Sequence, residues 1–284
     1  MNRQFFGTLL LCAATPLAAQ PDHASHAAPR PAAGVWTTQP LLLPAGGRGE
    51  RAAALVRPSG IAAATLNVYA PVGGPTAGRQ TVAVDAAGAR ISSGTPQLGN
   101  FHWLVMREET PERVKVASTA WYFGNPGPSP KALLAETRHE LEIVPEPLPR
   151  EHAQYRESEK WRFVVRLHGQ PLAAQPVMLE TEFGSRSTFT TDAAGVATVL
   201  FPRDFQPQAK ESGHGRPSAG FVLSTEKESA GVRYQTAFNL NYGPDADRQR
   251  SLAWGAAFGL LGMLAASPLL RRRGQPVNEE VGDA

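Results

Sequence analysis

The sequence predicts an all-β protein in which two β-sandwiches follow one another along the chain. Short runs of alternating apolar and polar residues, rich in Val, Thr, Ile and aromatics, recur throughout. They are separated by turn residues, with 27 glycines and 25 prolines among 284 residues. The tetrapeptide Asp-Ala-Ala-Gly also appears twice, at 85–88 and at 192–195. The interval between the copies is close to the length of one sandwich domain, about 100 residues, which favours a tandem arrangement.

The first segment has the layout of a secretory signal peptide. Arg3 precedes an apolar run over residues 5–14, and the small pair Ala18-Ala19 follows. We therefore expect residues 1–19 to be removed and residues 20–33 to form a flexible leader. Cys12, the single cysteine, lies in the removed segment, so the mature chain would contain no disulfide or cysteine metal site.

The body of the chain contains two sets of predicted strands. Alternation and β-branched content define them. The first set comprises residues 52–58, 63–71, 79–84, 101–108, 113–123 and 139–145; the second comprises 160–168, 175–183, 186–191, 195–201, 220–228 and 232–242. We assign 34–144 to the first sandwich, the proline-rich stretch 145–151 to a linker and 152–243 to the second sandwich. Residues 129–138 are compatible either with a short helix or with a loop.

The repeated tetrapeptide is explained by turn chemistry. An Asp side chain accepts hydrogen bonds from turn N–H groups, and Gly adopts the left-handed conformation that lets the next strand begin. Asp85–Gly88 and Asp192–Gly195 are therefore predicted to be hairpin turns.

The C-terminal region predicts a transmembrane helix. Residues 251–270 carry no charge, and about 20 residues of helix cross a bilayer core. The three arginines at 271–273 place the tail, residues 271–284, in the cytoplasm by the positive-inside rule. A buried core helix is the alternative. Gly255 and Gly259 form a G-x-x-x-G pair through which two such helices could associate.

Three histidines are the candidate metal ligands. His23 and His26 lie in the leader, and neutral imidazoles at this spacing can share nickel, copper or zinc. His214 lies in a long loop of the second sandwich. A solvated leader and an ordinary loop are the alternatives. His102 and His139 alternate with strand residues, so we interpret both as structural.

Catalysis and nucleic-acid binding are not predicted. The chain has no G-x-S-x-G, H-E-x-x-H or phosphate-loop motif, and its mature part has no cysteine nucleophile. The formal charge is +3, and the only tight basic cluster is 271–273, so no basic face with interleaved aromatics is indicated.

The second strand set resembles a known group of domains. "VVRLHGQPLAAQPVMLETE" followed by "FTTDAAGVATVLF" is similar to periplasmic immunoglobulin-like domains of nickel-uptake accessory proteins and of proteins with domains of unknown function. It is also similar to carboxypeptidase-regulatory-like modules. The similarity covers about residues 140–243, and the signal peptide and C-terminal anchor also fit the nickel-uptake-like group.

The resemblance implies two immunoglobulin-like sandwiches in the periplasm, anchored in the inner membrane of a bacterium. It also implies an accessory role in transition-metal uptake, with a transporter or receptor as partner. The alternative is a structural or protein-interaction scaffold that binds no metal.

Overall fold

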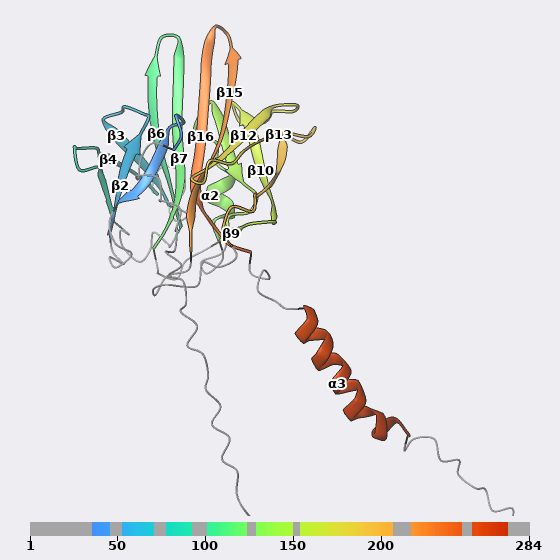
Figure 1. The fold of residues 1–284 in the computed structure, drawn as a ribbon. Coiled ribbons are helices and arrows are strands. Elements are labelled where there is room, and N and C mark those ends of the chain that lie inside the picture. The colour runs from blue at the N-terminus through green and yellow to red at the C-terminus, as the bar shows by residue number, and fades with distance from the viewer. Residues whose placement is uncertain are drawn as a thin grey trace, which may run out of the picture.

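The computed structural model describes residues 36–45, 53–70, 78–92, 101–123, 129–149, 154–206, 217–245 and 252–271. Outside the two helices these residues are mostly β-strand, and each of the twelve predicted segments overlaps a strand, which confirms the all-β fold class (Figure 1). The earlier strands are β1 (Leu41–Ala45), β2 (Ala53–Ser59), β3 (Thr65–Tyr69), β4 (Arg79–Ala83), β5 (Ala89–Ser92), β6 (Phe101–Thr110) and β7 (Arg113–Tyr122). The later ones are β8 (Leu141–Pro145), β9 (Tyr155–Arg156), β10 (Lys160–Leu167), β11 (Gln170–Pro171), β12 (Pro176–Thr181), β13 (Arg186–Thr190), β14 (Val196–Leu200), β15 (Ala219–Ser229) and β16 (Val232–Gly243).

The same pattern of strand pairing occurs twice. In the first set, β1 pairs with β2, β2 with β5, β3 with β4 and β6, and β6 with β7, all antiparallel. In the second set, β8 pairs with β10, β10 with β14, β12 with β13 and β15, and β15 with β16, also antiparallel. Each pairing of the first set therefore has a counterpart in the second. We call strands β1–β7 the first module and strands β8–β16 the second module.

The two modules share one large sheet. Their last strands, β7 and β16, run parallel, and residues 113–119 pair with residues 233–239. We call this parallel pairing the seam. It joins the strands into a nine-stranded sheet of order β13-β12-β15-β16-β7-β6-β3-β4, with β9 pairing beside β16. An unpaired strand edge invites association with another chain, and the seam removes one such edge from each module.

Two smaller sheets cover opposite faces of the large sheet. Along β6, the side chains of Trp103 and Val105 join the core under β8, β10 and β14, whereas Leu104 and Met106 join the core under β2 and β5. Successive side chains of a strand point to opposite faces, so the central part of the large sheet is buried on both sides. The result is three layers, with the small sheet of the first module on one face and that of the second module on the other.

Both Asp-Ala-Ala-Gly turns have the predicted local chemistry. Asp85 Oδ1 accepts hydrogen bonds from the backbone N–H groups of Ala87 and Gly88 at 2.8 and 3.0 Å, and Gly88 has φ +123°. Asp192 Oδ1 accepts from the N–H groups of Ala194 and Val196, both at 2.9 Å.

The hairpin interpretation holds for the turns themselves, since Asp85 and Gly88 form an antiparallel bridge, but the strands that flank each turn do not pair with each other. The first turn connects β4 of the large sheet to β5 of a small one, and the second connects β13 to β14 in the same manner. Each turn therefore carries the chain from one layer of its module to the other. Turn chemistry is local, so it does not reveal which sheet the following strand enters.

The connection between β7 and β8 joins the modules. It contains α2 (Lys131–Ala135), which agrees with the helical alternative for this region. Segment 139–145, which the alternation pattern grouped with the first set, forms β8 and pairs with β10 of the second module. Strand pairing, which the pattern does not encode, decides to which module β8 belongs.

The connection also contacts the first module. The guanidinium of Arg138 lies 4.9 Å from the ring centroid of Tyr69 and 6.0 Å from that of Trp103. Arg107 on β6 donates to Glu140 at 2.7 Å. These contacts bind the start of the second module to β3 and β6 of the first.

The C-terminal segment forms helix α3 (Leu252–Arg271), drawn apart from the sheets in Figure 1. Phe258, Leu260, Leu261, Met263 and Leu264 on this helix are exposed. Within the part of the chain that the structure describes, no helix meets the length and apolarity needed to cross a membrane.

Candidate functional site

The predicted metal ligands lie outside the described residues. This applies to His23, His26 and His214, and also to the signal segment with Cys12. In the described ranges, no group of three or more His, Cys, Asp or Glu side chains is arranged to hold a metal ion. The predicted helix-association pair, Gly255 and Gly259, lies on α3, where a Cβ on either residue would meet no atom within 4 Å.

The two histidines interpreted as structural lie inside the β body. His102 on β6 is buried, and its ring meets that of Phe123 edge-on at 4.8 Å. His139 immediately precedes Glu140, which accepts a hydrogen bond from Arg107. Burial, opposed by nearby Glu140, lowers the pKa of His139 to about 4. A neutral imidazole in this position lies within the connection between the modules.

The two ends of the β body differ. We call the end where β16 finishes at Gly243 the base. Strand directions also place there the turn after β12, because Thr181 pairs with Phe221. The start of β10 lies there too, because Tyr155, just before β10, pairs with Tyr242. The end of β14 lies beside it, because Lys160 pairs with Leu200. The β6–β7 and β15–β16 hairpin turns lie at the opposite end, which we call the tip (Figure 1).

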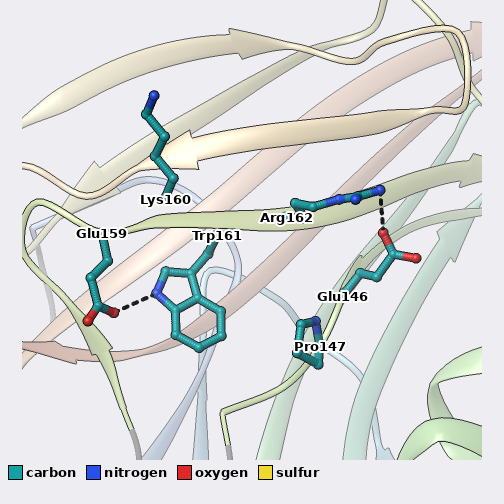
Figure 2. A pocket seen from close by; sticks show the side chains of 6 residues that line it. All are labelled: Glu146, Pro147, Glu159, Lys160, Trp161 and Arg162. Atoms are coloured by element: carbon teal, nitrogen blue, oxygen red, sulfur yellow. Dashed lines mark hydrogen bonds and ion pairs between the residues drawn. The ribbon is translucent and has the colours of Figure 1, made fainter. Parts of the chain in front are cut away.

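A shallow hollow of about 490 Å³ lies at the base, beside the start of β10 (Figure 2). It is lined by Glu146, Pro147, Glu159, Lys160, Trp161 and Arg162. The indole Nε1–H of Trp161 donates to Glu159 at 2.9 Å, and Arg162 pairs with Glu146 at 3.0 Å. Lys160 points away from the other side chains in Figure 2. These groups can contact a partner through an aromatic surface, a proline ring and charges.

Hydrogen bonds also hold other parts of the base together. Asp204 accepts from the hydroxyls of Thr181 at 2.8 Å and Ser185 at 2.5 Å, and also from Tyr242. Burial, together with the bond to Asp204, raises the pKa of Tyr242 well above its usual range, so the phenol stays protonated. The network fixes the turn after β12 to the end of β16.

The tip is polar and carries both signs of charge. Glu109 and Glu112 on one hairpin, and Glu228 and Arg233 on the other, are exposed. The two hairpins are joined there by a bond from the Arg233 N–H to the carbonyl oxygen of Glu112 at 3.0 Å. The tip is therefore a pair of linked hairpins with solvated side chains.

Sequence reasoning missed the features of the base. From the sequence we would interpret Trp161, Phe183 and Leu200 as ordinary strand or turn residues. Their common position depends on strand direction in a folded sheet. The one local signal in the sequence was Phe183 next to Gly184, because a large aromatic residue is uncommon in a tight turn.

Comparisons with known proteins give no family assignment. No family model and no curated protein matches the chain. Among solved structures, it is similar to one described as "Structural insight into host cell surface retention of a 1.5-MDa bacterial ice-binding adhesin", at 12% identity and TM-score 0.24, covering 73% of this chain and 65% of that one.

A second is described as "Ca2+-stabilized adhesin helps an Antarctic bacterium reach out and bind ice" (12% identity, TM-score 0.23), with 69% of this chain and 44% of that one covered. A third, "Biofilm associated protein - BSP domain", has 13% identity and TM-score 0.19, with 73% and 29% covered. The chain thus spans less than two thirds of each of these structures, and TM-scores this low carry no functional argument.

Proposed function

We propose that this protein is a membrane-anchored extracytoplasmic scaffold whose two immunoglobulin-like sandwiches act as one rigid body that holds a polar tip away from the membrane. The observation that supports this function best is the seam. Two modules joined only by a linker would move relative to each other. Two modules that share a sheet are coupled by backbone pairing, which here joins residues 113–119 to residues 233–239.

Side chains reinforce the seam on the face covered by β1. The hydroxyl of Thr119 donates to the carbonyl oxygen of Asn239 at 2.7 Å. The amide of Asn239 accepts from the N–H of Leu42 and donates to the carbonyl of Leu42, both at 2.9 Å. The first strand of the first module is thereby fixed to the last strand of the second. This supports a rigid body rather than one that bends between the modules.

The anchor in this proposal is segment 251–270. It is uncharged, is followed by three arginines, and carries exposed apolar side chains on α3. With the signal peptide, this arrangement leaves residues 20–250 on the outer face of the inner membrane. Association of two anchors through Gly255 and Gly259 belongs to the same proposal.

Two measurements test the function. Topology reporters fused after residue 245 and after residue 284 should be active outside and inside the cytoplasm, respectively. Spin labels on Ala83→Cys and Thr188→Cys, which lie on the outermost strands of the large sheet, should give one narrow distance distribution. If both reporters were active outside the cytoplasm, segment 251–270 would not span the membrane. A broad distance distribution would contradict the rigid body.

A metal role stays a prediction for the leader and for the loop that contains His214. Nickel or copper bound by the leader should be lost when both His23 and His26 are changed to Ala, and binding should weaken as pH falls through about 6.5. A loss with His214→Ala would move the site to the second module. If no nickel or copper binds at neutral pH, the scaffold function remains as the proposal without a metal role.

A further inference from the structure

We propose that the base of the β body docks against the lipid surface, with Phe183 and Leu200 entering the interfacial region of the bilayer. This inference rests on the anchor of the proposed function. It adds a second contact with the membrane, which would fix the orientation of the rigid body.

The first observation is where exposed apolar side chains occur. Among the described residues of the β strands and their turns, the large hydrophobic side chains left exposed are Phe183, at 52%, and Leu200, at 44%. Both lie at the base, because β12 and β14 run toward it. Because both lie at the same end of the body, one surface placed against the base can contact both.

The second observation is that Phe183 is held in place. Its ring meets that of Phe205 at 5.0 Å, and Phe205 meets Tyr242 at 5.3 Å. The N–H of Gly184 donates to the carbonyl of Thr181 at 2.8 Å, which closes the turn that presents the ring. Aromatic rings are favoured at the level of lipid headgroups, where one part is apolar and the surroundings are wet.

The third observation is the length of the connection to α3. The β body is described to residue 245, and α3 begins at Leu252. A fully extended chain spans at most about 3.6 Å per residue, so these two points are no more than about 25 Å apart. The base is therefore the part of the body that faces the bilayer, and the short connection keeps it there.

Cationic side chains accompany the apolar pair. Lys160 is the strand partner of Leu200. Arg186 and Arg203, with side chains 68% and 64% exposed, lie beside the turns that follow β12 and β14, and pair with Glu180 and Asp245 respectively. Long cationic side chains can reach lipid phosphates while their stems cover apolar surface. Since all phospholipids carry a phosphate, the surface fits a phospholipid headgroup layer.

The test uses the mature full chain reconstituted in phosphatidylcholine vesicles. The mature chain has no native cysteine, so single labels can be placed by Phe183→Cys, Leu200→Cys, Glu228→Cys at the tip and Ala256→Cys on α3. An apolar fluorophore on each cysteine is exposed to lipids that carry a nitroxide quencher in the headgroup or in the acyl chain. No other protein is present, so quenching reports lipid contact alone.

We expect headgroup nitroxides to quench the labels at 183 and 200 several-fold more strongly than the label at 228, and acyl-chain nitroxides to quench the label at 256. Base labels quenched no more than the tip label overturn the docking, even when the label at 256 is quenched. An unquenched label at 256 overturns the anchor, whatever the base labels show. The same measurements with phosphatidylglycerol added should increase quenching at the base if Lys160 and the arginines face the lipid.

Discussion

Acidification should weaken the connection between the modules through His139. Its imidazole is mostly buried, and its Nε2 has no hydrogen-bond partner among the described residues. Burial lowers the pKa of His139 to about 4; the carboxylate of Glu140 opposes this shift, and the charges of Arg107, Arg138 and Arg79 favour it. These groups belong to β4, β6 and the connection itself, so protonation would introduce a positive charge among three guanidinium groups.

The direction and the size of this loss of stability follow from the linkage between proton binding and folding. In the unfolded chain His139 takes a pKa of about 6.5, so the unfolded state binds the proton first as pH falls. The stability that comes from a neutral His139 is complete above pH 6.5 and is lost progressively between about 6.5 and 4. Two pKa values about 2.5 apart predict a loss of about 2 kcal/mol between pH 7 and pH 5.

The assay is urea unfolding of the mature chain and of His139→Gln at pH 7 and pH 5. The substitution removes the titrating group, so the loss of unfolding free energy over this range should be smaller by about 2 kcal/mol in the variant. The carboxylates titrate in both proteins, so their contributions to the loss of unfolding free energy cancel when the two proteins are compared. His168→Gln, which changes an exposed histidine of the second module, should leave the loss as in the wild type. Equal losses in wild type and His139→Gln would refute the reasoning.

Two further predictions concern particular residues of the fold. Asn239→Ala should reduce the free energy of unfolding by about 2 to 3 kcal/mol, because the buried N–H and C=O of Leu42 lose their partner; Asn241→Ala, an exposed amide on the same strand, is the control and should change it little in urea unfolding. Gly195→Ala should destabilise more than Gly184→Ala in the same assay. Both positions have positive φ, but a Cβ at Gly195 would lie 2.8 Å from the backbone N of Leu172 whereas a Cβ at Gly184 meets nothing within 4 Å. Equal losses for the two glycine variants would show that backbone strain alone, and not the close approach of Leu172, explains the requirement for Gly.

The strands and turns were readable from the sequence because their signals are local. Alternation of side chains located the longer strands, such as β6, β7, β15 and β16, and the Asp-Ala-Ala-Gly repeats located two turns. Four strands were not predicted: β1, β5 and the two-residue strands β9 and β11. In β1, Leu41 and Leu42 are buried on opposite faces, so the strand shows no alternation, and β5 has only four residues.

The sequence by itself determined the all-β class, the repeated turn and the apolar C-terminal segment, because each depends on residues within one short stretch. Only the tertiary structure decided that β7 and β16 pair in parallel, that β8 belongs to the second module and that Phe183 and Leu200 share one end. The paired residues of the seam, such as Thr119 and Asn239, are 120 positions apart. Their contact depends on which edges two finished sandwiches leave open, and no local pattern of residue types carries that information.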